Sequence, residues 1–160
     1  MDGVSLGKQE ITDCKAVFQA EYKPGKLEVI AYDADGKESG RDELVSAAEE
    51  TKLTISAEES IIKADGEDLA YISVEITDNA GIRKMFSDRK VMVTVSGAGT
   101  LVAVGSAACR AEESYPGNSF ATNNGRMIAI VRSDGTEGRI YITASANDLK
   151  PVTVTIEAAR

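Results

Sequence analysis

The stretch from 91 to 109, VMVTVSGAGTLVAVGSAAC, decides the fold predicted for this chain. The run VMVTV at 91–95 has a valine at every second position, the period-two pattern of a β-strand with one buried face. Gly97 and Gly99 interrupt the run, and LVAV at 101–104 begins a second apolar strand. Glycine adopts backbone angles that residues with a Cβ avoid, so two strands joined by a tight corner are expected here.

Composition excludes several classes of partner. The 160 residues are 42% apolar and only 5% aromatic, with no tryptophan, which predicts an aliphatic core. A net charge of −8 argues against nucleic acid or an anionic membrane as a partner, because both need a basic face, and we expect neither. No continuous apolar run is long enough to cross a bilayer. The first residues, MDGVSLGKQE, lack the apolar core of a signal peptide, and the localisation stays open.

Histidine is absent, and this removes the commonest general base and the commonest zinc ligand. The cysteines, Cys14 and Cys109, lie far apart and form no CxxC motif, so a zinc or thioredoxin-like site is not expected. The sequence leaves a disulfide between them open, but we favour two unpaired, partly buried thiols. No metal or other cofactor is predicted.

Residues 49–160 carry a regular series of short strand patterns. We expect strands at 53–57, 61–62, 70–77, 91–95, 101–104, 127–132, 140–146 and 152–156. This spacing is typical of an antiparallel β-sandwich of immunoglobulin-like type, which takes roughly 100 residues. Helix is nearly absent, since only 42–52 has helical composition and its apolar spacing is poor.

Residues 1–48 hold fewer strand patterns. Short strands are expected at 4–6, 16–22, 27–32 and 43–46, with Pro24-Gly25 joining the second and third as a hairpin. The sequence DADG at 33–36 predicts a further turn. So thin a sheet must cover its apolar face with something else, and we therefore interpret 1–48 as part of a domain, with AAEETK at 47–52 as the boundary.

Several longer segments resemble one family when they are taken in order. YKPGKLEVIAYDADGKESGRDELVSA at 22–47 resembles the end of an immunoglobulin-like domain of bacterial glycoside hydrolase family 2 β-galactosidases. LTISAEESIIKADGEDLAYISVEITDNAG at 53–81 is similar to the start of the next domain, an invasin-like sandwich. VSGAGTLVAVGSA, EESY, GRMIAIVR and GRIYITASANDL continue the resemblance to 149, although many relatives have GNG followed by Asp-Pro near 105–109.

The resemblance implies an all-β chain in which 1–48 is the C-terminal part of a preceding immunoglobulin-like domain and 49–160 is a complete sandwich. It implies a non-catalytic C-terminal accessory region that packs against other domains or subunits of a parent hydrolase. The family's two catalytic glutamates lie in a (β/α)₈ barrel that no segment here matches. We therefore expect no catalytic residue in this chain and no enzyme activity of the chain by itself.

A carbohydrate-binding or adhesin-like module is the alternative from a different class. Its candidate residues are Tyr71, Tyr115 and Glu112, with Phe120 as a further aromatic in the long irregular stretch 106–125. The structural interpretation places Tyr71 on the outer face of its strand, where exposed tyrosine is common. In the same interpretation Tyr115 and Phe120 fix the loop to the end of the sandwich. A homo-oligomer also stays open.

Acidic residues that lie near one another are expected to stabilise loops and turns. For the adjacent Glu112 and Glu113 we favour an ion pair with Arg110, Arg126 or Arg132 over a carboxylate pair for glycoside chemistry. The clusters at 33–38 and 65–68 lack the spacing of a calcium loop, and their Asp-Gly pattern is typical of turns.

Overall fold

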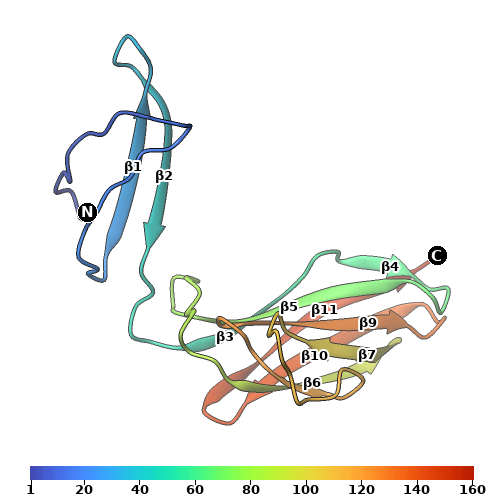
Figure 1. Cartoon of the computed structure of the whole chain (residues 1–160). Helices are drawn as coiled ribbons and strands as arrows, with labels where there is room; N and C mark the ends of the chain where they lie inside the picture. The colour runs from blue at the N-terminus through green and yellow to red at the C-terminus, as the bar shows by residue number, and fades with distance from the viewer. The chain divides into compact units, whose positions relative to one another are not determined.

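The computed structural model describes all 160 residues and is all-β, with eleven strands and no helix. It separates into two compact units, Met1–Ala47 and Ala48–Arg160 (Figure 1). The predicted absence of helix is confirmed, and part of the stretch with helical composition lies in strand β2 (Glu38–Val45). No helix is present that could span a membrane.

The second unit is a sandwich of two sheets. One has five strands in the order β4 (Ile61–Lys63), β11 (Leu149–Ala159), β10 (Gly138–Ala146), β6 (Lys90–Gly97) and β8 (Ser119–Ala121). The other has four, in the order β3 (Lys52–Ala57), β5 (Leu69–Thr77), β9 (Arg126–Ser133) and β7 (Gly99–Gly105). All pairs are antiparallel except β4 with β11. All eight strands predicted in this part of the sequence are present, and the all-β sandwich class is confirmed.

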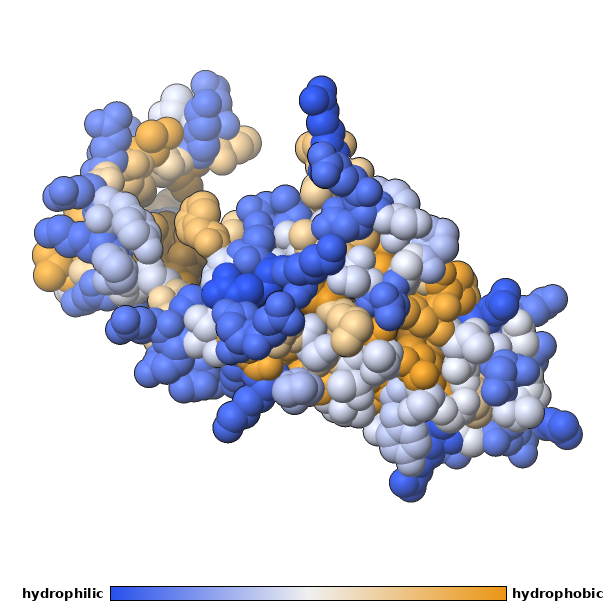
Figure 2. Space-filling model, turned by 90° about the horizontal axis from the view of Figure 1, so that it is seen from below, coloured by the Kyte–Doolittle hydropathy of each residue, from blue (hydrophilic) through white to orange (hydrophobic).

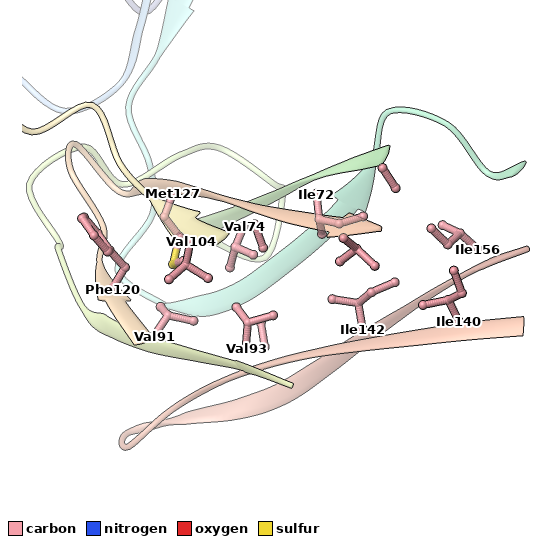
Figure 3. Packing of buried hydrophobic residues seen from close by; sticks show 14 of the residues in the cluster. Ile72, Val74, Val91, Val93, Val104, Phe120, Met127, Ile140, Ile142 and Ile156 are labelled. Atoms are coloured by element: carbon pink, nitrogen blue, oxygen red, sulfur yellow. The ribbon is translucent and has the colours of Figure 1, made fainter. Parts of the chain in front are cut away.

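The core lies between the two sheets and is aliphatic, as the composition indicated. Figure 3 shows Ile72 and Val74 from one sheet pointing toward Val93 and Ile142 from the other. All four side chains are fully buried, because alternation along each strand directs every second residue inward. Val95, the third valine of the deciding stretch, is only partly buried and packs against the margin of the core.

The glycine corner at 97–99 carries the chain from one sheet to the other, since β6 and β7 belong to different sheets. Gly97 has a φ of +94°, and a Cβ placed on it would lie 2.1 Å from the carbonyl oxygen of Arg139. A side chain is therefore excluded by both backbone angle and space. The expected tight corner is confirmed.

One strand escaped prediction. The stretch 106–125 was expected to be irregular, yet Ser119–Ala121 forms β8 and pairs with β6. Phe120 in this strand is buried in the core opposite Val91 in the pairing register.

The first unit has only two strands, β1 (Lys26–Tyr32) and β2 (Glu38–Val45). The predicted strands at 4–6 and 16–22 are wrong, because those segments have no strand partner and stay irregular. The predicted hairpin partner is also wrong: β1 pairs with β2 across the turn at 33–37. Asp33 shapes that turn by accepting hydrogen bonds from the amides of Asp35 and Lys37.

One face of the hairpin is mainly charged and also holds Ile30 and Val45, whereas the other is mainly apolar and also holds Asp42, which lies opposite Val29. On the charged face Lys26 pairs with Glu43, and Arg41 pairs with Glu28 and Glu38. On the other, Leu27 lies opposite Leu44 and next to Val29 on the same strand. These three side chains are exposed, Val29 by 54% and Leu44 by 71%, and orange hydrophobic residues reach the surface of this unit in Figure 2. Phe18 in the preceding segment is exposed as well, by 41%.

The cysteines depart from their expected environment. Both thiols are free, as predicted, but Cys14 and Cys109 are exposed rather than partly buried. Each lies in an irregular segment outside the strands, where no second layer covers it.

Candidate binding surfaces

Tyr71 lies on the outer face of the four-stranded sheet. Its neighbours along β5, Ala70 and Ile72, point into the core, so alternation turns the tyrosine outward, where it is 41% exposed. In the pairing register Tyr71 lies opposite Ile130 of β9, which in turn lies opposite Ala103 of β7. Tyr71, Ile130 and Ala103 therefore form a row of side chains across the outer face of the sheet.

Tyr115 is held at the edge of the sandwich by its backbone and its ring. Its carbonyl accepts a 2.8 Å hydrogen bond from the amide of Val104, which joins the loop to the edge of β7. The ring lies against Gly105 and stacks on Phe120 with centroids 5.4 Å apart. A Cβ on Gly105 would lie 3.2 Å from this ring, so the glycine makes room for it. Phe120 is the buried part of the stack, and Tyr115 remains 55% exposed.

The expected ion pair of Glu112 or Glu113 with a nearby arginine is wrong. Glu113 instead accepts a 3.2 Å hydrogen bond from the amide of Ala121, which fixes the loop to β8. Arg126 is engaged by Glu75 at 3.6 Å. The glutamate thus ties down the loop as expected, but through the backbone of a strand that the sequence pattern did not reveal.

Glu112 lines a shallow polar hollow of about 570 Å³ together with Lys90, Arg110 and Glu113. A second hollow of about 310 Å³ also uses Lys90 and continues toward Met92 and Ser145. Tyr71 lines neither hollow. The structure therefore places Tyr115 and Glu112 in one loop and Tyr71 on the sheet, and the three residues form no single site.

Both acidic clusters serve turns. Asp65 accepts hydrogen bonds from the amides of Glu67 and Asp68, both at 2.8 Å, and these bonds lower the pKa of its carboxyl. Asp68 in turn accepts from the amide of Lys63. No group of three or more such side chains is arranged so that it could hold a metal ion.

A feature that sequence reasoning missed is the segment RKMFSDRK at 83–90, between β5 and β6. Phe86 at its centre is fully exposed, and Met85 beside it is half exposed. The sequence signal that could have revealed this segment is an aromatic residue close to four cationic residues in a chain whose net charge is −8. The segment shows no period-two pattern, because it forms no strand.

The five-stranded and four-stranded sheets together define the second unit as a β-sandwich module. A family model described as glycoside hydrolase family 2 C-terminal domain 5 matches residues 53–155. The chain belongs to this family. A second model, a domain of unknown function (DUF4982), matches residues 1–40.

Similar proteins come from Bacteroides. Beta-galactosidase BoGH2A of Bacteroides ovatus is 25% identical over 99% of this chain and 19% of its own length. A crystal structure of a glycosyl hydrolase family 2 member from Bacteroides cellulosilyticus is 36% identical, with a TM-score of 0.94 over 100% of this chain and 21% of that one. Another structure of a family 2 member from the same species is 37% identical, with a TM-score of 0.92 over 98% of this chain and 22% of that one. The chain thus spans about a fifth of the length of these relatives.

Proposed function

We propose that this chain is a non-catalytic accessory region of a larger family 2 glycoside hydrolase of β-galactosidase type, and that it packs against other domains of that parent. The observation that carries the proposal is the uncovered apolar face of the hairpin. Leu27, Val29 and Leu44 expose apolar surface that burial would stabilise by roughly 25 cal/mol per Å². A face of this kind is typical of a docking surface whose partner is missing.

The edges of the hairpin support the same conclusion. β1 and β2 pair only with each other, so the outer edge of each strand has no strand partner. Two-stranded ribbons are marginal in water and gain stability when further strands extend them. Residues 1–48 are therefore proposed to be the C-terminal part of a preceding immunoglobulin-like domain, and 49–160 a complete invasin-like sandwich. The catalytic glutamates belong, in this proposal, to the parent outside these residues.

The test is a surface mutation in the full-length parent. Val29→Asp places a charge on the apolar face and is expected to lower the melting temperature of the parent by several degrees. The same change in the 160-residue chain should have little effect, because Val29 is already exposed there. Ser39→Asp adds the same charge to the hairpin at an exposed polar position and is the matched control. Equal, small effects of both variants in the parent would contradict the packing role.

Glycan binding is the second candidate, favoured by the exposure of Tyr71 and Tyr115. Tyr115 and Glu112 belong to the same loop, but only Glu112 lines the larger hollow, so in this proposal a sugar stacks on the exposed ring outside the hollow. Calorimetric titration of galactosides and β-linked galactan fragments tests it. Saturable heat that Tyr115→Ala abolishes, while Tyr71→Ala leaves it intact, would establish a loop site. No heat at millimolar ligand would leave the packing role alone.

A further inference from the structure

The turn between β8 and β9 has two central residues, Asn124 and Gly125, and both have a positive φ, of +52° and +71°. The amide of Asn123 donates a 2.9 Å hydrogen bond to the carbonyl of Arg126, and the amide of Arg126 donates back at 3.2 Å. These φ signs and hydrogen bonds are typical of a type I′ turn, for which asparagine followed by glycine is the preferred pair. The turn carries the chain from the five-stranded to the four-stranded sheet.

Packing in the sandwich excludes any residue other than glycine at position 125. A Cβ placed on Gly125 would lie 2.5 Å from the carbonyl oxygen of Lys84. The Gly125 carbonyl also accepts a 2.8 Å hydrogen bond from the amide of Ile76 in β5, which holds the glycine against this neighbour. At position 124 the left-handed backbone favours asparagine, one of the few residues with a side chain that tolerates it. The fold therefore selects the pair Asn-Gly for this turn.

An Asn-Gly pair is chemically labile, because glycine leaves its own backbone nitrogen unshielded. Once this nitrogen has lost its proton, it attacks the side-chain carbonyl carbon of the asparagine and forms a C–N bond. The departing NH₂ group takes up a proton and leaves as ammonia, and water then opens the succinimide ring to aspartate or isoaspartate. Asn124 alone among the asparagines of the chain precedes a glycine, and its side chain is exposed to water.

The nitrogen that would attack is already engaged by a carboxylate. The amide of Gly125 donates a 2.8 Å hydrogen bond to Oδ1 of Asp88. The same oxygen accepts a 3.0 Å hydrogen bond from the hydroxyl of Thr122, a buried residue. The Thr122 hydroxyl in turn accepts a 2.9 Å hydrogen bond from the amide of Arg89. Asp88 is thus held beside the turn by contacts other than the one with Gly125.

The Asp88 carboxylate opposes the reaction in two ways. A hydrogen bond to a charged acceptor is stronger than one to a neutral acceptor, and it must break before the Gly125 nitrogen is free to turn toward the Asn124 side chain. The negative charge of the carboxylate also disfavours a second negative charge on a nitrogen that lies only 2.8 Å away. Both effects act on loss of the amide proton, the step that starts deamidation.

We propose that Asn124 is a site of spontaneous deamidation and that Asp88 keeps the reaction slow in the folded sandwich. Isoaspartate at this position adds a methylene group to the backbone of a two-residue turn and a negative charge close to Asp88. Because β9 begins at Arg126, directly after the turn, the product should fold less stably than the unmodified chain. The inference concerns the sandwich alone and does not depend on the proposed packing against a parent.

The experiment follows deamidation of the 160-residue chain in mildly alkaline buffer, with and without strong urea, by mass spectrometry of the tryptic peptide 111–126. In urea the wild type and Asp88→Ala should react equally fast, because the sequence around Asn124 is the same in both. In native buffer the wild type should react far more slowly than in urea, and Asp88→Ala several times faster than the wild type. Asp148→Ala is the matched control, since it releases the neighbouring Arg89 and leaves the bond to Gly125 in place.

Three results would overturn the proposal. Equal rates for the wild type and Asp88→Ala in native buffer would remove any role of the carboxylate, and a slower rate in Asp88→Ala would make it a general base that promotes the reaction. A rate in Asp148→Ala as fast as in Asp88→Ala would assign the protection to general rigidity.

Hydrogen exchange of the Gly125 amide, measured by nuclear magnetic resonance, gives an independent arm, because base-catalysed exchange removes the same proton. Asp88→Asn keeps the shape of the side chain without its charge and serves where Asp88→Ala does not fold. Both the exchange of this amide and the deamidation of Asn124 should be faster in Asp88→Asn than in the wild type. Unchanged rates of both in this variant would refute the protective role of the charge.

Discussion

The two units of this chain use the same alternating pattern with opposite results. In the sandwich, every second residue of β5 and β10 faces a second sheet and is fully buried, as Ile72 and Ile142 are. In the hairpin, Leu27 and Val29 also lie on one face, although Ile30 interrupts the alternation, and they face no second layer. The difference shows that alternation specifies which side of a strand is apolar, whereas burial depends on whether the chain supplies a covering sheet.

The largest expected effect separates the two units directly. Ile142→Ala should lower the free energy of unfolding of the sandwich by about 2–5 kcal/mol, because a fully buried side chain leaves a cavity. Val29→Ala in the 160-residue chain should change it by less than about 0.5 kcal/mol. Urea denaturation of both variants checks the comparison, and a similar loss for each would show that the hairpin is packed after all.

Turn glycines sharpen the comparison further. Gly97→Ala should cost about 2 kcal/mol, since both the positive φ and the Arg139 carbonyl oppose a Cβ. Gly36 in the hairpin turn also has a positive φ, of +78°, but a Cβ there would meet nothing within 4 Å. Gly36→Ala should therefore cost roughly 1 kcal/mol or less, measured by the same denaturation. Equal losses of stability in the two variants would show that the close approach of the Arg139 carbonyl to Gly97 does not affect folding stability.

A pH-dependent effect is expected at the start of the sandwich. Asp78 accepts hydrogen bonds from the amides of Ala48 and Ile82, both at 2.8 Å, and the first of these is the main cause that lowers the pKa of its carboxyl below 3.8. A lowered folded-state pKa adds stability above the unfolded value, and this stability is lost as the pH falls through the folded-state pKa.

Asp78→Asn should therefore destabilise the chain near neutral pH. It should also reduce the further loss of stability that the wild type shows below about pH 4. Urea midpoints of the wild type and the variant at pH 6 and pH 3 measure the difference. If the variant lost as much stability between pH 6 and pH 3 as the wild type does, the acid sensitivity would belong to other carboxylates.

The smallest effect belongs to the charged face of the hairpin. Arg41 pairs with Glu28 and Glu38, and all three side chains remain accessible to solvent. Arg41→Gln should change the thermal unfolding of the chain only slightly, and the difference should vanish at about 1 M salt, where charges are screened within a few ångströms. A change that persisted at high salt would indicate that the ion pairs hold the hairpin together.

Sequence reasoning predicted most of the sandwich and little of the first unit, for one physical reason. Strands such as 70–77 and 127–132 have both a pattern and partners, so the pattern sufficed. The alternation at 16–22 is equally clear, but no strand is available to complete its hydrogen bonds, and the segment remains irregular. The choice of the turn at 33–37 over Pro24-Gly25 likewise depends on which partner strand exists.

The candidate sites show the same limit. The outward direction of Tyr71 followed from alternation alone. The stacking of Tyr115 on Phe120 and the bond from Ala121 to Glu113 depend on β8, whose three residues are too few to give a periodic signal. The full exposure of Phe86 could not be predicted from alternation, because its segment forms no strand.

Amide hydrogen exchange, followed by mass spectrometry in the 160-residue chain and in the full-length parent, tests the central claim most directly. The account predicts that β1 and β2 exchange rapidly in the chain alone and become strongly protected in the parent. Peptides from β5 and β9 should be protected alike in both, because their sandwich is closed by its own second sheet. Hairpin protection that is already complete in the chain alone, and unchanged in the parent, would contradict the claim that this unit is completed by the rest of the hydrolase.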